Sequence, residues 1–508
     1  MSQHQHDHSG HQHGDDDMDM GGQAGLTPAS FRAEMRGRGG DDALTATDLF
    51  RADLTTLNRS GVTGFVEAAM ADGVLTVRIE ADGVEPNQTH IVHIHGRVGE
   101  DGQALNSRTP GPVFDTDGDG FVELGEGLPA YGPILLNLSS PQGAGAAGFP
   151  TAPDGRVRMV ESYDLSSSAG FGMGFDAGDL MPLDLREFVL HGLSVDGSAG
   201  AGTPGEIDGT AGYKLVLPAA SGEFVAQGSE LYGRGGHDTL TGSRGDDTLD
   251  GGSANDMLRA GLGDDVLMGG SGEDMLLGEA GADLLQGGAN DDTLLGGTGA
   301  DILLGGAGKD VLYGDDGPGT ERGSDLAADR LNGGAGNDQL WIGDGGDVAT
   351  GGAGEDIFGF RFANPQTPLA AGTGPAFATI TDFSAASDTL LFDVPGVGED
   401  AAGANFAPGG GADGTAESFF SGAAADSDGE RVMVLTDQGF ASGALAVQAA
   451  QGEEAGDFVV YFNTTVNAAS LLVVTAPDQA TSIARFTDIV SLADFQAAGF
   501  GAGDFLFA

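Results

Sequence analysis

The feature of this sequence that most constrains its fold is an aspartate at every ninth position over long stretches between residues 233 and 358. A leucine follows two residues after each aspartate of the first run, from Leu240 to Leu312, so the charged and apolar positions keep one register. A disordered Gly/Asp-rich linker is the alternative interpretation, but a disordered chain does not require the aspartates and leucines to keep a common spacing. The first run comprises Asp238, Asp247, Asp256, Asp265, Asp274, Asp283, Asp292, Asp301 and Asp310, and the second, after an insertion at about Pro318 to Ala328, comprises Asp329, Asp338, Asp347 and Asp356.

The repeating unit reads GGxGxDxUx, where U is apolar, as in Gly296–Leu304. Glycines permit the positive φ angles of a tight turn, and xUx is a short strand that points U inward. Two units make one coil, and stacking places equivalent turns about 4.8 Å apart. Aspartate carboxylates and backbone carbonyls of neighbouring turns are ligands that calcium prefers. The pattern therefore predicts a parallel β-roll stabilised by calcium.

On this motif, residues 233–358 resemble the RTX family, whose hemolysin-type nonapeptide repeats bind calcium. The resemblance implies a calcium-loaded β-roll in a secreted protein. Ala349, at an apolar position, marks a weakened repeat. Six further residues replace glycines of the motif, and the sites beside them are expected to be weaker or empty: Arg234, Ser243, Ala254, Ala260, Glu279 and Asn290.

Composition narrows the partners of the chain. The 77 acidic and 21 basic residues give a net charge of −56, which suits divalent cations and makes nucleic acid and anionic membranes poor partners. Cysteine is absent, which excludes disulfides and thiolate metal sites. Neither a cleaved signal peptide nor an apolar stretch of about 18 residues is found, so no membrane span is predicted and an export signal is expected elsewhere.

The length of 508 residues predicts several domains, and we expect an all-β chain in four segments. Residues 1–40 read as a disordered His/Asp-rich tail, 41–224 as a β-sandwich, 225–359 as the β-roll and 360–508 as a β-rich cap. The tail carries histidines that either chelate Zn²⁺, Ni²⁺ or Cu²⁺ or only solvate the terminus. These are His4, His6, His8, His11 and His13.

The segment after the repeats is expected to continue the roll and then cap it. Residues 377–394 are similar to the segment that commonly follows RTX arrays, and 457–463 and 470–476 alternate like strands. The last fifteen residues, DFQAAGFGAGDFLFA, are apolar and lack basic residues. They resemble C-terminal signals for type I secretion machinery; an ordinary last strand is the alternative.

Residues 81–96, 126–134 and 187–193 resemble the CHRD family, a β-sandwich related in fold to copper/zinc superoxide dismutases. In HIVHIHG, His93 and His95 lie two residues apart and share one outward face of a strand, while Val92 and Ile94 point to the core. His191 is the third candidate ligand for copper or zinc, at positions that match copper ligands of the dismutases. No histidine lies between His95 and His191, so the bridging and zinc-ligand histidines of that family have no counterpart. Structural histidines with satisfied hydrogen bonds are the alternative.

Residues 115–126, DTDGDGFVELGE, match the EF-hand loop pattern without a mismatch. No flanking helices are predicted, so we interpret the segment as an isolated calcium loop inserted between strands, with a plain acidic turn as the alternative. The expected ligands are Asp115, Asp117, Asp119, the carbonyl of Phe121, and Glu126.

Catalytic signatures are lacking, since the sequence contains no HExxH, GxSxG or GxxxxGK[ST] motif. The first hypothesis is therefore a secreted, non-enzymatic calcium-binding protein with a binding or structural role at a cell surface or in an extracellular matrix. The alternative hypothesis is a copper-dependent redox protein that uses His93, His95 and His191.

Overall fold

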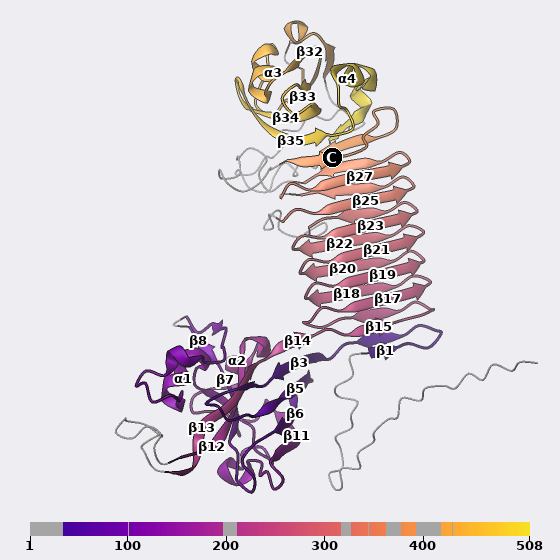
Figure 1. The fold of residues 1–508 in the computed structure, drawn as a ribbon. Coiled ribbons are helices and arrows are strands. Elements are labelled where there is room, and N and C mark those ends of the chain that lie inside the picture. Colours follow the sequence, from indigo (N-terminus) through magenta and orange to yellow (C-terminus); the bar gives the residue numbers. More distant parts are fainter. Residues whose placement is uncertain are drawn as a thin grey trace, which may run out of the picture.

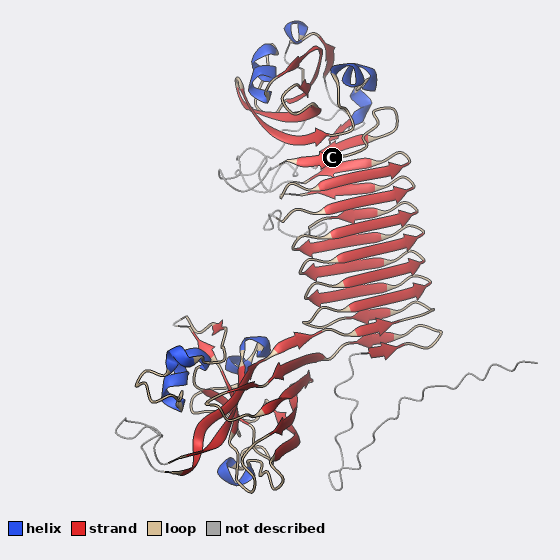
Figure 2. Cartoon of the chain, in the orientation of Figure 1, coloured by secondary structure: helices blue, strands red, loops and turns tan. Residues whose placement is uncertain are grey.

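The computed structural model describes residues 34–99, 101–196, 211–315, 327–343, 345–361, 377–392, 418–428 and 430–507. A long roll of stacked strands carries a sandwich domain at one end and a smaller cap at the other (Figure 1). Strands dominate, and helices are short and peripheral (Figure 2). The predicted all-β class is confirmed. The histidine-rich start of the tail lies outside the described residues.

The roll consists of two parallel sheets between which the chain alternates. In each sheet a strand pairs with the strand 18 residues later, as Leu249 does with Leu267, so two nonapeptides make one coil. One sheet contains β15 (Glu230–Tyr232), β17 (Thr248–Ser253), β19 (Val266–Ser271), β21 (Leu284–Ala289), β23 (Ile302–Ala307), β25 (Arg330–Ala335), β27 (Val348–Ala353) and β29 (Ala378–Ile380). The other contains β16 (Thr239–Thr241), β18 (Met257–Leu262), β20 (Met275–Ala280), β22 (Thr293–Thr298), β24 (Val311–Tyr313), β26 (Gln339–Ile342), β28 (Ile357–Phe360) and β30 (Thr389–Phe392).

The predicted apolar positions form the core of the roll. The leucines at the apolar position of each unit, from Leu240 to Leu340, lie between the sheets and are at most 1 % exposed. The stack also tolerates the insertion after the first run of repeats, because Leu303 pairs with Leu331, 28 residues later, where other coils pair at 18. The register of the roll is therefore set by the repeats on either side of the insertion.

The roll begins earlier in the chain than the sequence predicts. Strands β1 (Glu34–Arg36) and β2 (Ala43–Thr45) pair in parallel with β15 and β16. The expected boundary between tail and sandwich, at residues 40 and 41, therefore falls inside a coil of the roll, and the sandwich is an insertion after that coil. The sequence does not reveal this pairing, because the whole sandwich separates β1 from β15 along the chain.

The sandwich consists of two antiparallel sheets around a common apolar core. The orders are β10-β7-β12-β13-β4 and β11-β6-β5-β3-β14. The strands are β3 (Asp48–Asp53), β4 (Thr55–Thr56), β5 (Thr63–Ala71), β6 (Val74–Asp82), β7 (Val92–His95), β10 (Ile134–Asn137), β11 (Arg156–Asp164), β12 (Glu187–Val195), β13 (Gly212–Glu223) and β14 (Val225–Gln227). Outside these sheets lie the pair β8 (Arg97–Val98) and β9 (Ala104–Leu105) and the helices α1 (Leu124–Tyr131) and α2 (Ala177–Leu180).

The cap extends both sheets of the roll, as the sequence predicts. Strand β29 pairs with β35 (Gln479–Phe486), and β30 pairs with β36 (Phe505–Phe507). The remaining elements are β31 (Phe419–Gly422), β32 (Val432–Phe440), β33 (Phe458–Asn463), β34 (Ala468–Ala476), α3 (Gly443–Ala449) and α4 (Leu492–Ala498). Among the described residues, no helix has the length and hydropathy needed to cross a membrane.

The stacked core yields a test of the fold. Leu303 is fully buried, while its neighbour Ile302 is 40 % exposed on the outer face of the same strand. We expect Leu303→Ala to lower the free energy of unfolding in calcium by about 2–5 kcal/mol, because it leaves a cavity between the sheets. Ile302→Ala is the matched control, with a loss of about 1 kcal/mol or less. Denaturant unfolding measures both, and equal losses would contradict the assigned register.

Candidate metal centres

All thirteen repeat aspartates predicted as calcium ligands are buried in the turns of the roll. They form two ladders, one along each edge of the roll. In each ladder the backbone N–H of one aspartate donates to Oδ1 of the aspartate in the next coil, as Asp256 donates to Asp274 at 2.8 Å. The first edge carries Asp238, Asp256, Asp274, Asp292, Asp310, Asp338 and Asp356, and the second edge carries Asp247, Asp265, Asp283, Asp301, Asp329 and Asp347.

The second carboxylate oxygen, Oδ2, points to the first glycine of its own unit, except in the units of Asp265 and Asp347, which begin with Ala260 and Ile342. A Cβ placed on Gly305 would lie 2.5 Å from Oδ2 of Asp310 and 2.6 Å from the carbonyl oxygen of Gly333 in the next coil. Two oxygen acceptors thus converge on a space that only glycine leaves open. Oδ2 is buried without a hydrogen-bond partner in Asp238, Asp256, Asp265, Asp274, Asp283, Asp292, Asp310 and Asp338. Buried acceptors of this kind need a cation or a proton, and the donor set suits calcium.

The electrostatics of the ladders point the same way. Burial, followed by the charges of neighbouring aspartates, raises the pKa of Asp256 to about 6 and that of Asp265 to about 7. The same causes raise the pKa of Asp292 to about 7 and that of Asp338 to about 6. Without a cation, the folded roll therefore resists ionisation of its own ligands.

The glycine replacements have different consequences. Arg234, Ala254, Glu279 and Asn290 still adopt positive φ angles of 74–82°, so the turn survives there with a strained residue. Ser243 differs, because its hydroxyl contacts both carboxylate oxygens of Asp247 and its amide donates to Oδ2. The hydroxyl occupies both oxygens that would bind the ion, so this site stays predicted to be weaker.

The EF-hand-like loop brings three of its four predicted acidic residues together, and Asp119 lies outside this group. Single oxygens of Asp115, Asp117 and Glu126 lie within 4.8 Å of one another. Oδ2 of Asp117 and Oδ2 of Asp119 are buried and accept no hydrogen bond. Burial, and then the charges of Asp117 and Asp115, raises the pKa of Asp119. The loop therefore has the carboxylate set and the unsatisfied oxygens expected of a calcium site.

The expectation that no helix flanks this loop is wrong. Helix α1 begins at Leu124, inside the motif, and a capping box between Glu123 and Glu126 starts it. The helix escaped sequence analysis because its eight residues, LGEGLPAY, include two glycines and Pro129, which have low helix propensity.

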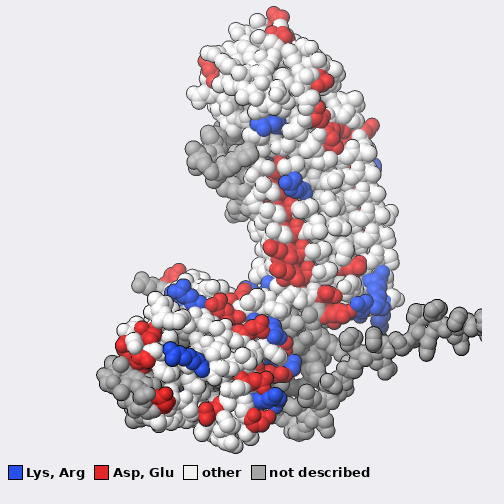
Figure 3. All heavy atoms as spheres, in the orientation of Figure 1, with Lys and Arg blue, Asp and Glu red and all other residues white. Residues whose placement is uncertain are grey.

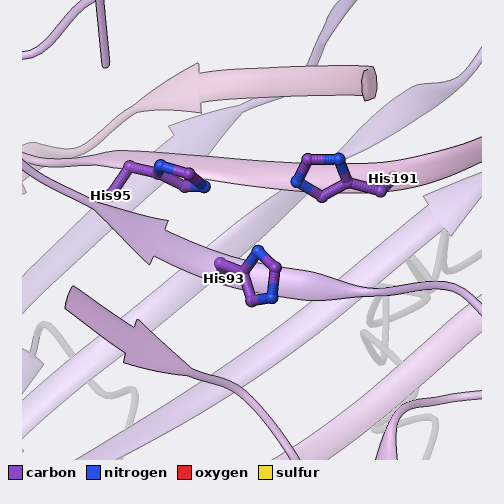
Figure 4. Close-up of side chains that lie close together, drawn as sticks. All are labelled: His93, His95 and His191. Carbon is purple, nitrogen blue, oxygen red and sulfur yellow. The ribbon is translucent and has the colours of Figure 1, made fainter. Parts of the chain in front are cut away.

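His93, His95 and His191 come together from β7 and β12, with one ring nitrogen of each within 4.8 Å of the others (Figure 4). Val92 and Ile94 point into the sandwich core, as predicted. The histidines lie on the opposite face, but they are at most 6 % exposed. The aromatic rings of Tyr131 and Phe149 lie beside them, at centroid distances of 4.6 Å from His95 and 5.6 Å from His93.

Hydrogen bonds fix which nitrogens face the centre. Nδ1 of His95 lies 2.8 Å from the carbonyl oxygen of Gly132, and Nδ1 of His191 lies 2.7 Å from that of Val216. A carbonyl only accepts, so Nδ1 carries the proton and Nε2 keeps its lone pair. Nε2 of both residues and Nδ1 of His93 are buried without a partner. This arrangement fits Cu²⁺ or Zn²⁺, which imidazole nitrogen binds.

Burial keeps these rings neutral, which metal binding requires. Desolvation, then the charges of His191 and His95, lowers the pKa of His93 to about 2. Desolvation lowers the pKa of His95 to about 3 and that of His191 to about 4.

Sequence reasoning missed the residues that orient and accompany the histidines. Helix α1 starts in the EF-hand-like loop and ends next to Gly132, the acceptor for His95. Glu187 pairs with His95 across β12 and β7, is fully buried, and has a pKa raised to about 7 by desolvation. Only the fold brings these residues to the histidines, so no local motif could have found them.

Surface charge agrees with a cation-binding protein. Acidic side chains are visible on the sandwich, along the roll and on the cap, while basic ones are fewer (Figure 3).

Comparison with known proteins identifies the repeats. Residues 232–267, 250–285, 268–303, 286–320 and 325–358 match the family model described as the RTX calcium-binding nonapeptide repeat. A search of curated proteins finds no match. The matched residues coincide with the coils whose aspartates form the two ladders. Residues 232–320 and 325–358 of this chain are therefore calcium-binding RTX repeats, and their described part is folded as a parallel β-roll.

Proposed function

We propose that this protein is exported and folds its roll on calcium outside the cell, where it has a binding or structural role and no enzymatic one. The observation that carries the proposal is the pair of aspartate ladders, in which the eight buried Oδ2 atoms named above have no hydrogen-bond partner and that of Asp310 faces the carbonyl oxygen of Gly333. Stacked carboxylates repel one another unless cations lie between them. Ion binding and folding are then one equilibrium, because the unfolded chain has no assembled sites.

Typical calcium affinities favour folding of the roll outside the cell. Extracellular calcium modules have Kd values of about 10⁻⁴ to 10⁻³ M. A site held at 100 times its Kd gains about 2.7 kcal/mol, so several sites rival the stability of a domain. In calcium-poor cytosol the same sites stay empty and the roll stays unfolded.

Type I secretion machinery is the proposed export route. The C-terminal residues Phe505–Phe507 form β36 and pair with β30 of the roll. Phe505 is fully buried there. A signal in this segment is therefore accessible only before the roll folds, which agrees with export of an unfolded chain.

For the sandwich, we propose that the EF-hand-like loop binds calcium and braces the domain. Asn58 supports this by donating from its side-chain amide to the carbonyls of Val122 and Pro218, which ties the loop to β13. Resemblance of this domain to the CHRD family stays a prediction.

A second candidate function is copper or zinc chemistry at the three histidines. It rests on the convergence of three buried neutral rings with free nitrogen lone pairs. The absence of histidines between His95 and His191 argues against the two-metal centre of the dismutases. Copper-dependent redox activity at this centre is the alternative to a non-enzymatic role.

The raised aspartate pKa values predict how the calcium-free roll responds to pH. In the unfolded chain these carboxyls ionise near pH 4, whereas in the roll Asp256 and Asp265 ionise at about 6 and 7. Between these values the unfolded state releases protons first, so the calcium-free roll loses stability as pH rises from about 4 to 7. We expect hydrogen exchange of residues 248–313 in chelator to be slow at pH 5 and fast at pH 7.5, after correction for the intrinsic rate. Calcium at pH 7.5 should restore protection. Equal protection with and without calcium at pH 7.5 would refute calcium-linked folding.

Metal binding to the full chain tests the histidine centre, in a background where the five tail histidines are replaced by glutamine. We expect one Cu²⁺ or Zn²⁺ per chain, retained at pH 5 because the ring pKa values are about 2–4. His191→Gln should weaken binding by at least about 100-fold, since even outer-shell changes cost 10 to 100-fold. His237→Gln, an exposed histidine of the roll, is the control. Unchanged affinity after His191→Gln would leave the histidines structural.

Glu126→Gln tests whether the loop binds calcium, because it removes the negative charge of a proposed ligand. In the structure, Oε1 of Glu126 also accepts a hydrogen bond from the Thr116 amide at 2.7 Å. We expect loss of one calcium ion and loss of calcium-dependent protection of residues 115–131 in hydrogen exchange. Asp154→Asn, at an exposed acid of the same domain, should change neither. If both variants keep the full calcium count, the loop is a plain acidic turn.

A further inference from the structure

The coil that precedes the sandwich carries a repeat unit of its own. Residues 37–45 read GRGGDDALT, with glycine at positions 1 and 4, aspartate at position 6 and leucine at position 8 of the nonapeptide. Arg38 stands at position 2, where Arg234 also stands in the array. The matched repeats begin at residue 232, so this unit lies far outside them.

Strand pairing places the unit in register with the array. Leu44 pairs with Leu240, and Met35 pairs with Leu231. Both Met35 and Leu44 pack against the core of the roll. The unit is therefore the first coil of the same stack.

Two side-chain contacts of the array continue into this unit: the aspartate ladder of the first edge, and a contact made by the residue just before a repeat aspartate. The amide of Asp42 donates to Oδ1 of Asp238 at 2.7 Å, the contact that links successive aspartates of the first edge. Oδ1 of Asp41 accepts from the amide of His237 at 2.9 Å. The array repeats this contact between Asp246 and the amide of Asp264, also at 2.9 Å.

The oxygen pair found beside the first glycine of each unit is present here too. A Cβ on Gly37 would lie 2.6 Å from the carbonyl oxygen of Gly233 and 2.7 Å from Oδ2 of Asp42. The corresponding distances at Gly269 are 2.7 Å to the carbonyl oxygen of Gly287 and 2.5 Å to Oδ2 of Asp274. Oδ2 of Asp42 accepts from the amide of Arg38 and retains a second lone pair. In the turn stacked on this unit, Asp238 is 2 % exposed and its Oδ2 accepts no hydrogen bond.

We propose that the turns at residues 37–42 and 233–238 hold a calcium ion between them, with Asp42 and the Gly233 carbonyl among its ligands. This inference rests on the proposed calcium-dependent folding and adds a site before the matched repeats. Its special property is that its two halves lie 196 residues apart, on opposite sides of the sandwich.

The consequence is a calcium-dependent clamp on the inserted domain. The chain leaves the first coil at Thr45 and enters the sandwich at Asp48, and it returns from β14 at Gln227 to β15 at Glu230. Both connections are short, so closing the first coil fixes the sandwich against the end of the roll. Across this junction, a guanidinium nitrogen of Arg244 in the roll lies 3.4 Å from Oδ1 of Asp184 in the sandwich. Without the ion, residues 34–45 would join the tail and one of the two connections would be released.

The test compares matched pairs of variants in the full chain. Asp42→Asn removes the proposed ligand charge, and Asp41→Asn is its control, because the array carries asparagine at that position in Asn255 and Asn337. Gly37→Ala places a methyl group between the two oxygens, and Gly39→Ala is its control, because a Cβ on Gly39 meets nothing within 4 Å. Bound calcium is counted by native mass spectrometry, and hydrogen exchange with and without calcium follows residues 34–45 and 248–313 separately.

We expect Asp42→Asn and Gly37→Ala each to bind one calcium ion fewer and to lose calcium-dependent protection of residues 34–45. Residues 248–313 should keep their calcium response in every variant, and both controls should behave as the unchanged chain. A full calcium count in Asp42→Asn and Gly37→Ala would overturn the proposal and leave the first coil a metal-free end of the stack. If residues 248–313 of the unsubstituted chain showed no change in hydrogen exchange on adding calcium, calcium-dependent folding itself would be refuted.

Discussion

Repulsion between stacked aspartates is the constraint on which the rest of this structure depends. Each coil of the array adds a buried aspartate to each edge, and successive aspartates are in contact, as the amide of Asp256 donates to Asp274 and that of Asp265 to Asp283. The leucine column between the sheets supplies the apolar burial that favours stacking, but it does nothing for the charges. On the proposal of calcium-linked folding, cations satisfy the oxygens that backbone amides leave unpaired, and calcium is then part of the folded state.

The strongly periodic part of the fold was predictable from the sequence, and the parts that depend on distant contacts were not. Register, coil length and the buried face follow from a period of nine, as the pairing of Leu249 with Leu267 confirms. The unit at residues 37–45 escaped because a single repeat has no period, although Gly37, Asp42 and Leu44 fit the motif. Helix α1 escaped because its glycines and Pro129 have low helix propensity, although the capping box that starts it is a local feature. Glu187 is placed beside His95 by strand pairing alone.

The histidine centre shows where local geometry suffices and where it fails. Alternation along a strand predicts that His93 and His95 share a face, and the structure adds that the face is covered. That covering changes the chemistry, because exposed imidazoles titrate near pH 6.5 whereas these stay neutral to about pH 4. The carbonyls of Gly132 and Val216, which select the tautomers, belong to segments that no spacing rule connects to the histidines.

Insertion of the sandwich after one coil links two kinds of stability. A domain appended to the end of a roll would be indifferent to whether the roll forms, whereas here the chain must pass through the roll both before and after the sandwich. Closing the first coil brings together Asp42 and Asp238, 196 residues apart, at a cost in chain entropy that grows only with the logarithm of loop length. The sandwich, whose own strands β3 and β14 pair at its base, already holds the two ends near each other. Folding of the sandwich therefore lowers the entropic cost of the first coil, and the first coil in turn orients the sandwich on the roll.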